Sequence, residues 1–444
     1  MNRSKNFSLY SLSWPIFVDI LLHFSTILIN TYMIGRVSTA YLAAIGIGNQ
    51  IFDLFITIFN FISVGCGVVV SHYLGAGKND KANQAIHISL AFNFIIGFLS
   101  TSIVLLFSND VLNIMNTPTH LLIHSHTYLS TLSFSLTLES ISVILSTCLR
   151  VYGKSKFAMF ITFIANIITI LGNLAVLYGF FGFPKFGLIG VSCSTAFGKL
   201  CSIILLFSFL FYRMKINFIP IFLLRWSSQI LKKILQIGLP AAGENLVWIL
   251  QYMISSAFIN LIGETALAAQ TLYFQMSLFI MLFGISIGIG NEIIIGHLIG
   301  ARRFNCAYKR GTKSLTIGFF ITIIMVFIFW CFRVSLLGLV TKDQNIIKIL
   351  SPIFLISIFL EPGRTLNIIV VNSLRATGDA KFPFFIAIIS MWGIAIPIGY
   401  FFGIKMEMGL AGIWIGFLLD EWIRGFINSC RWFSRTWEKN SIKK

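Results

Sequence analysis

The sequence predicts an all-α integral membrane protein in which twelve transmembrane helices form two six-helix, pseudo-symmetric bundles. Its composition is the first reason: 57% of the 444 residues are hydrophobic and only 11% are charged, whereas soluble proteins are about a quarter charged. Apolar runs of about 20 residues, long enough to cross a hydrocarbon core of roughly 30 Å, recur along the chain. The third reason is an internal repeat.

The two halves of the sequence match each other when one is shifted by 225 residues. Pro15 falls on Pro240, Asp19 on Glu244, and the segment 149–157 on 374–382, with Leu-Arg-x-x-Gly-x-x-Lys-Phe in both. Many matches in one register indicate a duplication. Paired repeats in a membrane protein are typical of transporters.

Hydropathy and the positions of Pro and Gly place the spans. They are predicted at 12–34, 45–73, 86–107, 127–150, 157–181, 187–213, 234–259, 268–298, 312–332, 350–374, 382–403 and 409–432. The second and eighth exceed the bilayer thickness, so we expect them to tilt or to extend into the cytoplasm.

Each half holds six spans, which return the chain to the side on which it started. The halves therefore share one orientation, as parallel repeats do. We predict an N-terminal lobe at 1–213, a basic cytoplasmic linker at 214–233 and a C-terminal lobe at 234–444.

The net charge of +18 is explained by membrane topology rather than by nucleic-acid binding. With the N-terminus in the cytoplasm, 24 of the 33 Lys and Arg residues lie in cytoplasmic segments, 6 in external loops and 3 within spans. This bias follows the positive-inside rule. We expect a multi-pass protein of the plasma (inner) membrane, monomeric, with both termini cytoplasmic.

No residue pattern indicates a metal or a cofactor. The seven cysteines are scattered without a metal-ligand spacing. His120, His124 and His126 fall in the predicted external loop 108–126, where we expect a solvated segment rather than a metal site.

Acidic residues inside the spans are the main functional candidates, because a charge within the bilayer is costly. Asp19 and Glu244 each lie four residues after a proline, at equivalent positions of the repeat. They either respond to a cation or favour the positive end of a helix. Glu361 either forms a structural ion pair with Arg364, three residues on, or exchanges that partner for a proton, a sodium ion or substrate.

Other polar residues in the spans are weaker candidates. Asp53 and Glu292 are further intramembrane acids, whereas Asp420 and Glu421 are expected at the membrane interface. The uncharged candidates either line a cavity or form interhelical hydrogen bonds; they are Asn30, Gln50, Asn245 and Gln275.

Several segments together resemble one family, the multidrug and toxic compound extrusion (MATE) transporters. They are 14–19, 41–50 and 65–77 in the first two spans, 238–245 in the seventh, and 361–364 and 372–379 in and after the tenth. The resemblance implies two six-helix lobes, alternating access and no cofactor. It also implies export of small organic, often cationic, compounds in exchange for Na⁺ or H⁺.

The family's functional residues carry over unevenly. Many members have an Asp fifteen residues after the proline of the first span, and this chain has Asn30 there, which cannot titrate. The acid of the seventh span matches Glu244. The acid of the tenth span falls on Arg364 by spacing, so Glu361 is a looser match.

Other functions fit the sequence less well. A lipid-linked saccharide flippase of related architecture would need a strongly cationic cavity, yet the spans hold more acids than bases. An enzyme would need a nucleophile, a metal or a close carboxylate pair, and no such motif is present. A passive channel is more often built from several identical subunits.

Overall fold

The computed structural model describes residues 7–115, 117–182, 184–214, 216, 227–341 and 343–442, and this part of the chain contains helices and no strand. The first half comprises α1 (Leu9–Val37), α2 (Thr39–Gly75), α3 (Asn79–Ile114), α4 (Thr119–Val151), α5 (Ser155–Tyr178), the 3₁₀ turn η1 (Phe180–Gly182), α6 (Gly187–Phe207) and the π-helical turn η2 (Ser208–Arg213).

The second half repeats this order. It comprises α8 (Ser228–Ile262), α9 (Glu264–Gly300), α10 (Phe304–Cys331), α11 (Arg333–Val340), α12 (Gln344–Thr377), a rod made of α13 (Lys381–Ser390), η3 (Met391–Ala395), α14 (Ile396–Tyr400) and η4 (Phe401–Lys405), then α15 (Gly409–Phe433) and α16 (Trp437–Ile442).

Each of the twelve predicted spans coincides with a helix or, for 382–403, with the α13–η4 rod. Within the described residues, eleven of these segments are long and apolar enough to cross a membrane. The twelfth, α15, carries three charged residues in its middle, Asp420, Glu421 and Arg424. The predicted fold class is confirmed.

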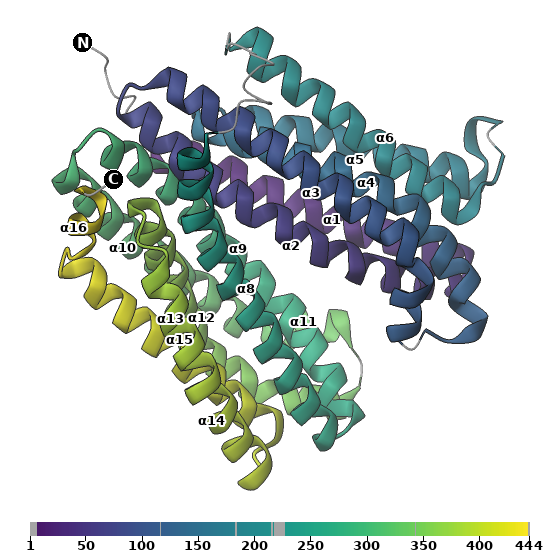
Figure 1. Ribbon diagram of the computed structural model, residues 1–444. Helices are drawn as coiled ribbons and strands as arrows, with labels where there is room; N and C mark the ends of the chain where they lie inside the picture. Colours follow the sequence, from purple (N-terminus) through teal and green to yellow (C-terminus); the bar gives the residue numbers. More distant parts are fainter. Residues whose placement is uncertain are drawn as a thin grey trace. The chain divides into compact units, whose positions relative to one another are not determined.

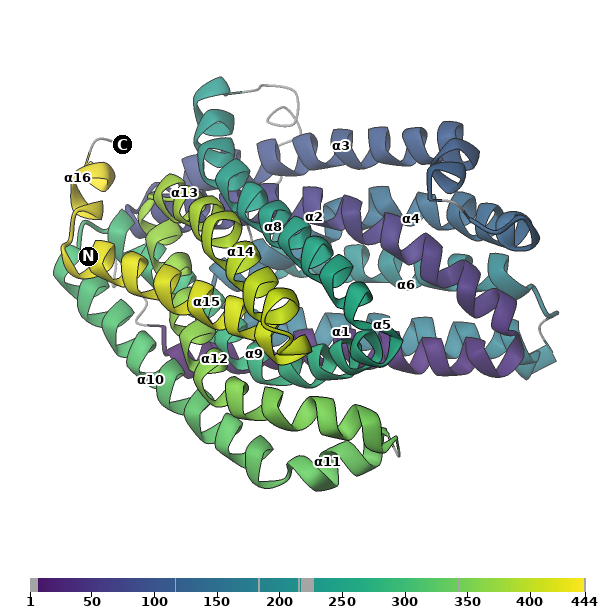
Figure 2. The same ribbon diagram turned by 90° about the horizontal axis from the view of Figure 1, so that it is seen from below.

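The helix bounds repeat with the same shift as the sequence. Both α2 and α9 have 37 residues and begin and end 225 residues apart, at a length of about 55 Å, which exceeds the bilayer core. Phe107 interrupts α3 with φ −116° and ψ 18°. Its repeat partner Phe332 separates α10 from α11, and Figure 2 shows the short α11 leaving the end of α10.

The chain divides into two compact units. The N-terminal unit consists of Trp14–Leu74 and Lys78–Gly238; the C-terminal unit consists of Leu239–Lys444, Gly75–Gly77 and the residues up to Ser13. Both principal boundaries lie inside helices, α1 and α8, and they are again 225 residues apart. Most of the predicted linker lies outside the described residues, and α8 already begins at Ser228.

Each unit therefore contains the beginning of the other half's first helix. In the N-terminal unit, Gly65 of α2 lies against the backbone of Ile234 at the start of α8. In the C-terminal unit, its repeat partner Gly290 of α9 lies against Ser13 at the start of α1. At both places the glycine has no side chain that would hinder this close approach of the two helices.

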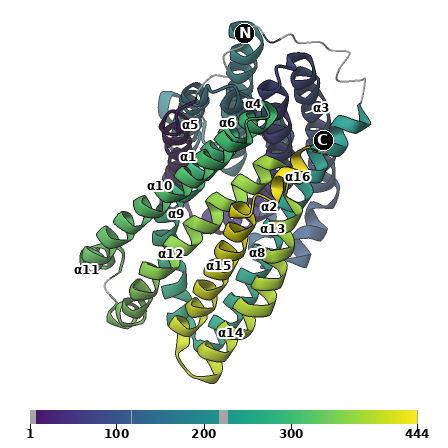
Figure 3. The same ribbon diagram turned by 90° about the vertical axis from the view of Figure 1, so that its left-hand side faces the viewer.

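One helix organises each unit. In the C-terminal unit α12 packs against α9, α10 and α15, and Figures 1 and 3 show α12 and α15 side by side. In the N-terminal unit its repeat partner α4 packs against α3 and α6. A buried apolar cluster that includes Tyr273, Leu360 and Trp414 fills the interior between α9, α12 and α15.

One predicted loop is shorter than expected. Because α4 begins at Thr119, the residues His120, His124 and His126 lie in its first turns rather than in a loop. The His124 ring contacts Tyr41 edge-on, with ring centroids 5.2 Å apart. Hydropathy had predicted only the later part of α4, from residue 127 onward.

Candidate functional site

The two acids singled out by the repeat each form an ion pair with an arginine. In the N-terminal unit Arg150 of α4 donates to Asp19 of α1. In the C-terminal unit Arg375 of α12 donates from Nη2 to Glu244 Oε2 of α8 at 2.6 Å. The two arginines are themselves 225 residues apart, so the same carboxylate–arginine ion pair occurs once in each unit.

The local sequence explains why both arginines lie where they do. Arg150 and Arg375 occupy the last turns of α4 and α12. Three residues later Gly153 and Gly378 adopt φ of 77° and 90°, a conformation that favours glycine and stops each helix. The Leu-Arg-x-x-Gly motif therefore presents an arginine at a fixed helix end in both units.

Glu292 makes the C-terminal version of this contact different. It lies on α9 and interacts electrostatically with Arg375, which also pairs with Glu244. Its Oε1 atom is buried and has no hydrogen-bond partner. The equivalent residue of the N-terminal unit is Gly67, which has no carboxylate to place beside Arg150.

A second pair of positions carries charges in both units. In the N-terminal unit Lys199 of α6 lies 2.5 Å from Glu139 of α4, measured from Nζ to Oε2. The residues 225 positions later are Arg424 of α15 and Arg364 of α12. In the N-terminal unit these two positions thus hold one acid and one base that pair with each other. The equivalent positions of the C-terminal unit hold two arginines.

These two arginines belong to a charged cluster in the C-terminal unit, formed by Glu361, Arg364, Asp420, Glu421 and Arg424. Arg364 Nη1 donates to Glu361 Oε1 at 2.9 Å, and its Nε lies 3.5 Å from Glu421 Oε1. Arg424 Nη2 lies 2.7 Å from Asp420 Oδ2 and 3.0 Å from Glu421 Oε1. All five residues are buried.

Neutral groups complete the surroundings of this charged cluster. Ser277 Oγ of α9 donates to Glu361 Oε1 at 2.5 Å and accepts from Arg364 Nη1 at 2.8 Å. Asn367 Nδ2 donates to Glu421 Oε2 at 2.9 Å. Buried charges are tolerated only when hydrogen bonds of this kind satisfy them.

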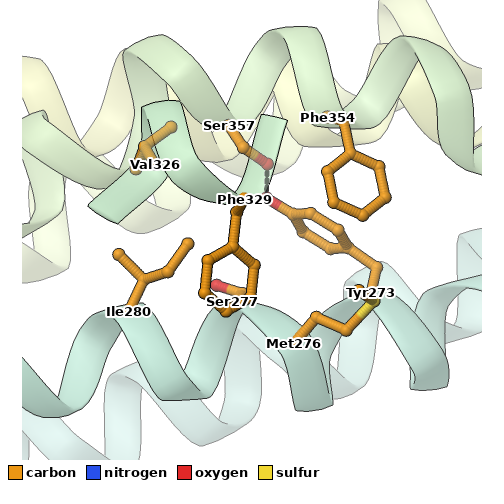
Figure 4. Close-up of a pocket in the computed structure, with 8 residues that line it drawn as sticks. All are labelled: Tyr273, Met276, Ser277, Ile280, Val326, Phe329, Phe354 and Ser357. Atoms are coloured by element: carbon orange, nitrogen blue, oxygen red, sulfur yellow. Dashed lines mark hydrogen bonds between the residues drawn. The ribbon is translucent and has the colours of Figure 1, made fainter. Parts of the chain in front are cut away.

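A small cavity borders the cluster. Its volume is about 10 Å³, room for about one water molecule. Ser277 is one of its lining residues, and the others are Tyr273, Met276, Ile280, Val326, Phe329, Phe354 and Ser357. Figure 4 shows the Tyr273 and Ser357 hydroxyls hydrogen-bonded to each other, with Oη and Oγ 2.6 Å apart.

The remaining predicted site residues do not form any of these ion pairs. Asn173 Nδ2 donates to Asn30 Oδ1 at 3.0 Å, so Asn30 takes part in an interhelical hydrogen bond. Gln50, Asp53, Asn245 and Gln275 are exposed on their helices. Within the described residues, no group of three or more His, Cys, Asp or Glu side chains is arranged to hold a metal ion.

Sequence reasoning missed two features of the site. It did not assign Arg150 and Arg375 as the partners of Asp19 and Glu244, although the repeat had aligned all four. It also expected Asp420 and Glu421 at a membrane interface, whereas the structure places both in the middle of α15 and buries them. The bases that the sequence places within spans, Lys199, Arg364 and Arg424, are the signal that could have located these acids, because a buried base requires a carboxylate partner.

Comparison with known proteins identifies the family. The MatE family model matches residues 15–175 and 240–401, one match in each half of the chain. An uncharacterized transporter of Bacillus subtilis, YisQ, is 37% identical over 433 residues, which cover 98% of this chain and 95% of that protein. A probable multidrug resistance protein NorM of Thermotoga maritima is 27% identical, with 93% and 89% of the two chains covered.

Solved structures agree with this fold. The crystal structure of a MATE protein in a bent conformation matches with a TM-score of 0.90 and 17% identity, and the match covers 98% of this chain and 96% of that one. At this identity the likeness shows the fold alone. Together with the match in each half, these relatives establish that the chain belongs to the MatE family, the multidrug and toxic compound extrusion transporters.

Proposed function

We propose that the protein is a secondary antiporter that exports organic, often cationic, compounds in exchange for inward flow of Na⁺ or H⁺. The observation that carries the proposal is the repeated carboxylate–arginine contact between the first and fourth spans of each half. Family membership supports transport rather than catalysis, and several relatives are named as probable multidrug resistance proteins.

The coupling step centres on Glu244 and Glu361. A cation that reaches Glu244 competes with Arg375 for the same carboxylate, and release of Arg375 frees the end of α12. A gradient drives such a cycle only if the ion binds one conformation more tightly than the other. The Glu244 side chain is 13% exposed, so it is accessible to a small ion without unfolding.

The charge distribution along the chain supports the membrane orientation. We place the transporter in the plasma (inner) membrane as a monomer with both termini in the cytoplasm, because basic residues are concentrated in the segments that this orientation puts there. The substrate is a small organic molecule.

A lipid-linked saccharide flippase is the alternative. Its pyrophosphate-bearing substrate would require an excess of cationic groups. In the C-terminal unit, however, the carboxylates of Glu244, Glu292, Glu361, Asp420 and Glu421 face only three arginines. This balance favours a cation as the bound ion.

The test is ethidium transport in everted membrane vesicles. Glu244→Gln should abolish ethidium accumulation driven by an imposed ion gradient, while the protein is still inserted at the wild-type level. Glu264→Gln, at the exposed start of α9, is the matched control and should transport normally. Unchanged transport by Glu244→Gln would remove this carboxylate from the mechanism.

A further inference from the structure

Two of the seven cysteines meet inside the N-terminal unit. Cys66 of α2 and Cys148 of α4 are 0% and 1% exposed, and their side chains hydrogen-bond to each other. They lie 82 residues apart in the sequence, so the packing of the two helices brings them together. The other five cysteines are exposed or half-buried. Cys66 and Cys148 therefore form a pair of thiols that is shielded from solvent.

The two helices are closely packed on either side of this thiol pair. About one turn before it, Ser63 Oγ lies 2.6 Å from Thr147 Oγ1 and donates to the Val143 carbonyl oxygen at 3.4 Å. Next to Cys66, a Cβ at Gly67 would lie only 3.1 Å from the Thr147 methyl group. A disulfide forms without backbone movement only where two backbones lie close together. The small residues Ser63 and Gly67 allow α2 and α4 this close approach.

The same two positions also meet in the C-terminal unit, with different chemistry. The residues 225 positions later are Asn291 of α9 and Ser373 of α12. Asn291 Nδ2 donates to Ser373 Oγ at 2.8 Å. The duplicated frame therefore places two side chains in contact at this point of both units. Of these two contacts, only the thiol pair can become covalent.

A pair of thiols can bind a metal ion or be oxidised, and the surroundings favour oxidation. Structural zinc takes four protein ligands and catalytic zinc takes three. Within the residues that the structure describes, no group of three or more His, Cys, Asp or Glu side chains could hold a metal ion. Oxidation to a disulfide needs only the two sulfurs. Because both thiols are buried, the oxidant must be small and uncharged, and hydrogen peroxide is both.

We propose that Cys66 and Cys148 are a redox modification site, which hydrogen peroxide converts into a disulfide that cross-links α2 to α4. One thiol attacks a peroxide oxygen, the O–O bond breaks, and a sulfenic acid and one water are formed. The second thiol attacks the sulfenic sulfur, the S–S bond forms, and the oxygen leaves as a second water. The two thiols lose two protons and two electrons, and the peroxide takes up both. A dithiol reductant restores the thiols.

Differential labelling of the purified protein tests the proposal. The protein is treated with hydrogen peroxide, denatured, blocked with N-ethylmaleimide, reduced, and labelled with an isotopically heavy maleimide for mass spectrometry. Peroxide should raise the heavy label on Cys66 and Cys148 together by about tenfold, and dithiothreitol added before denaturation should reverse this rise. A non-reduced digest should contain the two cysteines in one cross-linked peptide. Unchanged labelling of the pair, or a disulfide from either cysteine to an exposed one, overturns the proposal.

The matched control is the double variant Cys66→Asn/Cys148→Ser, which copies the Asn291–Ser373 contact into the N-terminal unit. Peroxide should raise the unfolding temperature of the wild type by about 5 °C, because the cross-link closes a long loop, and should leave that of the variant unchanged. If the variant fails to fold, oxidised wild type with and without dithiothreitol gives the same comparison. A disulfide without any rise, or an equal rise in the variant, would overturn the cross-link between α2 and α4.

Discussion

The N-terminal and C-terminal units share one helical frame but differ in the charges that they bury. In the N-terminal unit Asp19 pairs with Arg150 and Glu139 with Lys199, so each carboxylate has its own base. The same four positions in the C-terminal unit hold Glu244, Arg375, Arg364 and Arg424, and four further acids join them. The duplication set where helices are joined by charge. Around these positions five carboxylates of the C-terminal unit face three arginines, whereas in the N-terminal unit Asp19 and Glu139 each pair with one base.

The largest predicted difference between the units concerns Arg424 and its repeat partner Lys199. The Arg424 side chain is 4% exposed and the Lys199 side chain is 29% exposed. Arg424→Met should lower the free energy of unfolding by about 3–5 kcal/mol, because it strands buried carboxylates. Lys199→Met should cost about 1 kcal/mol or less. Unfolding titrations in detergent measure both, and equal losses would contradict the comparison.

The first turns of α8 and α1, which lie in the N-terminal and the C-terminal unit respectively, give a second comparison. A Cβ at Gly65 would lie 2.2 Å from the carbonyl oxygen of Ile234, whereas a Cβ at Gly290 would lie 2.4 Å from the Ser13 hydroxyl, which can rotate away. Gly65→Ala should therefore cost about 1–3 kcal/mol. Gly290→Ala should cost clearly less. Thermal unfolding of the two variants measures the order, and the reverse order would show that the helix starts pack differently.

Glu292 provides a smaller effect of opposite sign. It shares Arg375 with Glu244 and has a buried oxygen without a partner. Glu292→Gln removes that excess negative charge, so the free energy of unfolding should stay the same or rise by about 1 kcal/mol. A clear loss of stability would indicate that Glu292 has a counter-charge of its own.

Two native cysteines test the orientation with no expected change in stability. Cys306 and Cys331 are both exposed, near opposite ends of α10. With cytoplasmic termini, a membrane-impermeant maleimide should label Cys331 in intact cells and Cys306 only in everted vesicles. The opposite pattern would invert the topology and remove the argument from the positive-inside rule.

The sequence predicted the spans well because hydropathy depends on each segment alone. It also identified Asp19 and Glu244, because the repeat aligns them. Their arginines were not predicted, since an ion pair between residues 131 positions apart depends on how α1 packs on α4 and α8 on α12. The burial of Asp420 depends likewise on the packing of α15 against α12.

The most direct test of the account compares the repeat partners Asp19 and Glu244 in one assay. Asp19→Asn and Glu244→Gln are reconstituted at equal protein density, and ethidium uptake driven by a pH gradient is measured. If coupling lies in the C-terminal unit, Glu244→Gln should lose gradient-driven uptake while Asp19→Asn retains most of it. An Asp19→Asn protein that loses uptake as completely as Glu244→Gln would contradict the assignment of ion coupling to the C-terminal unit.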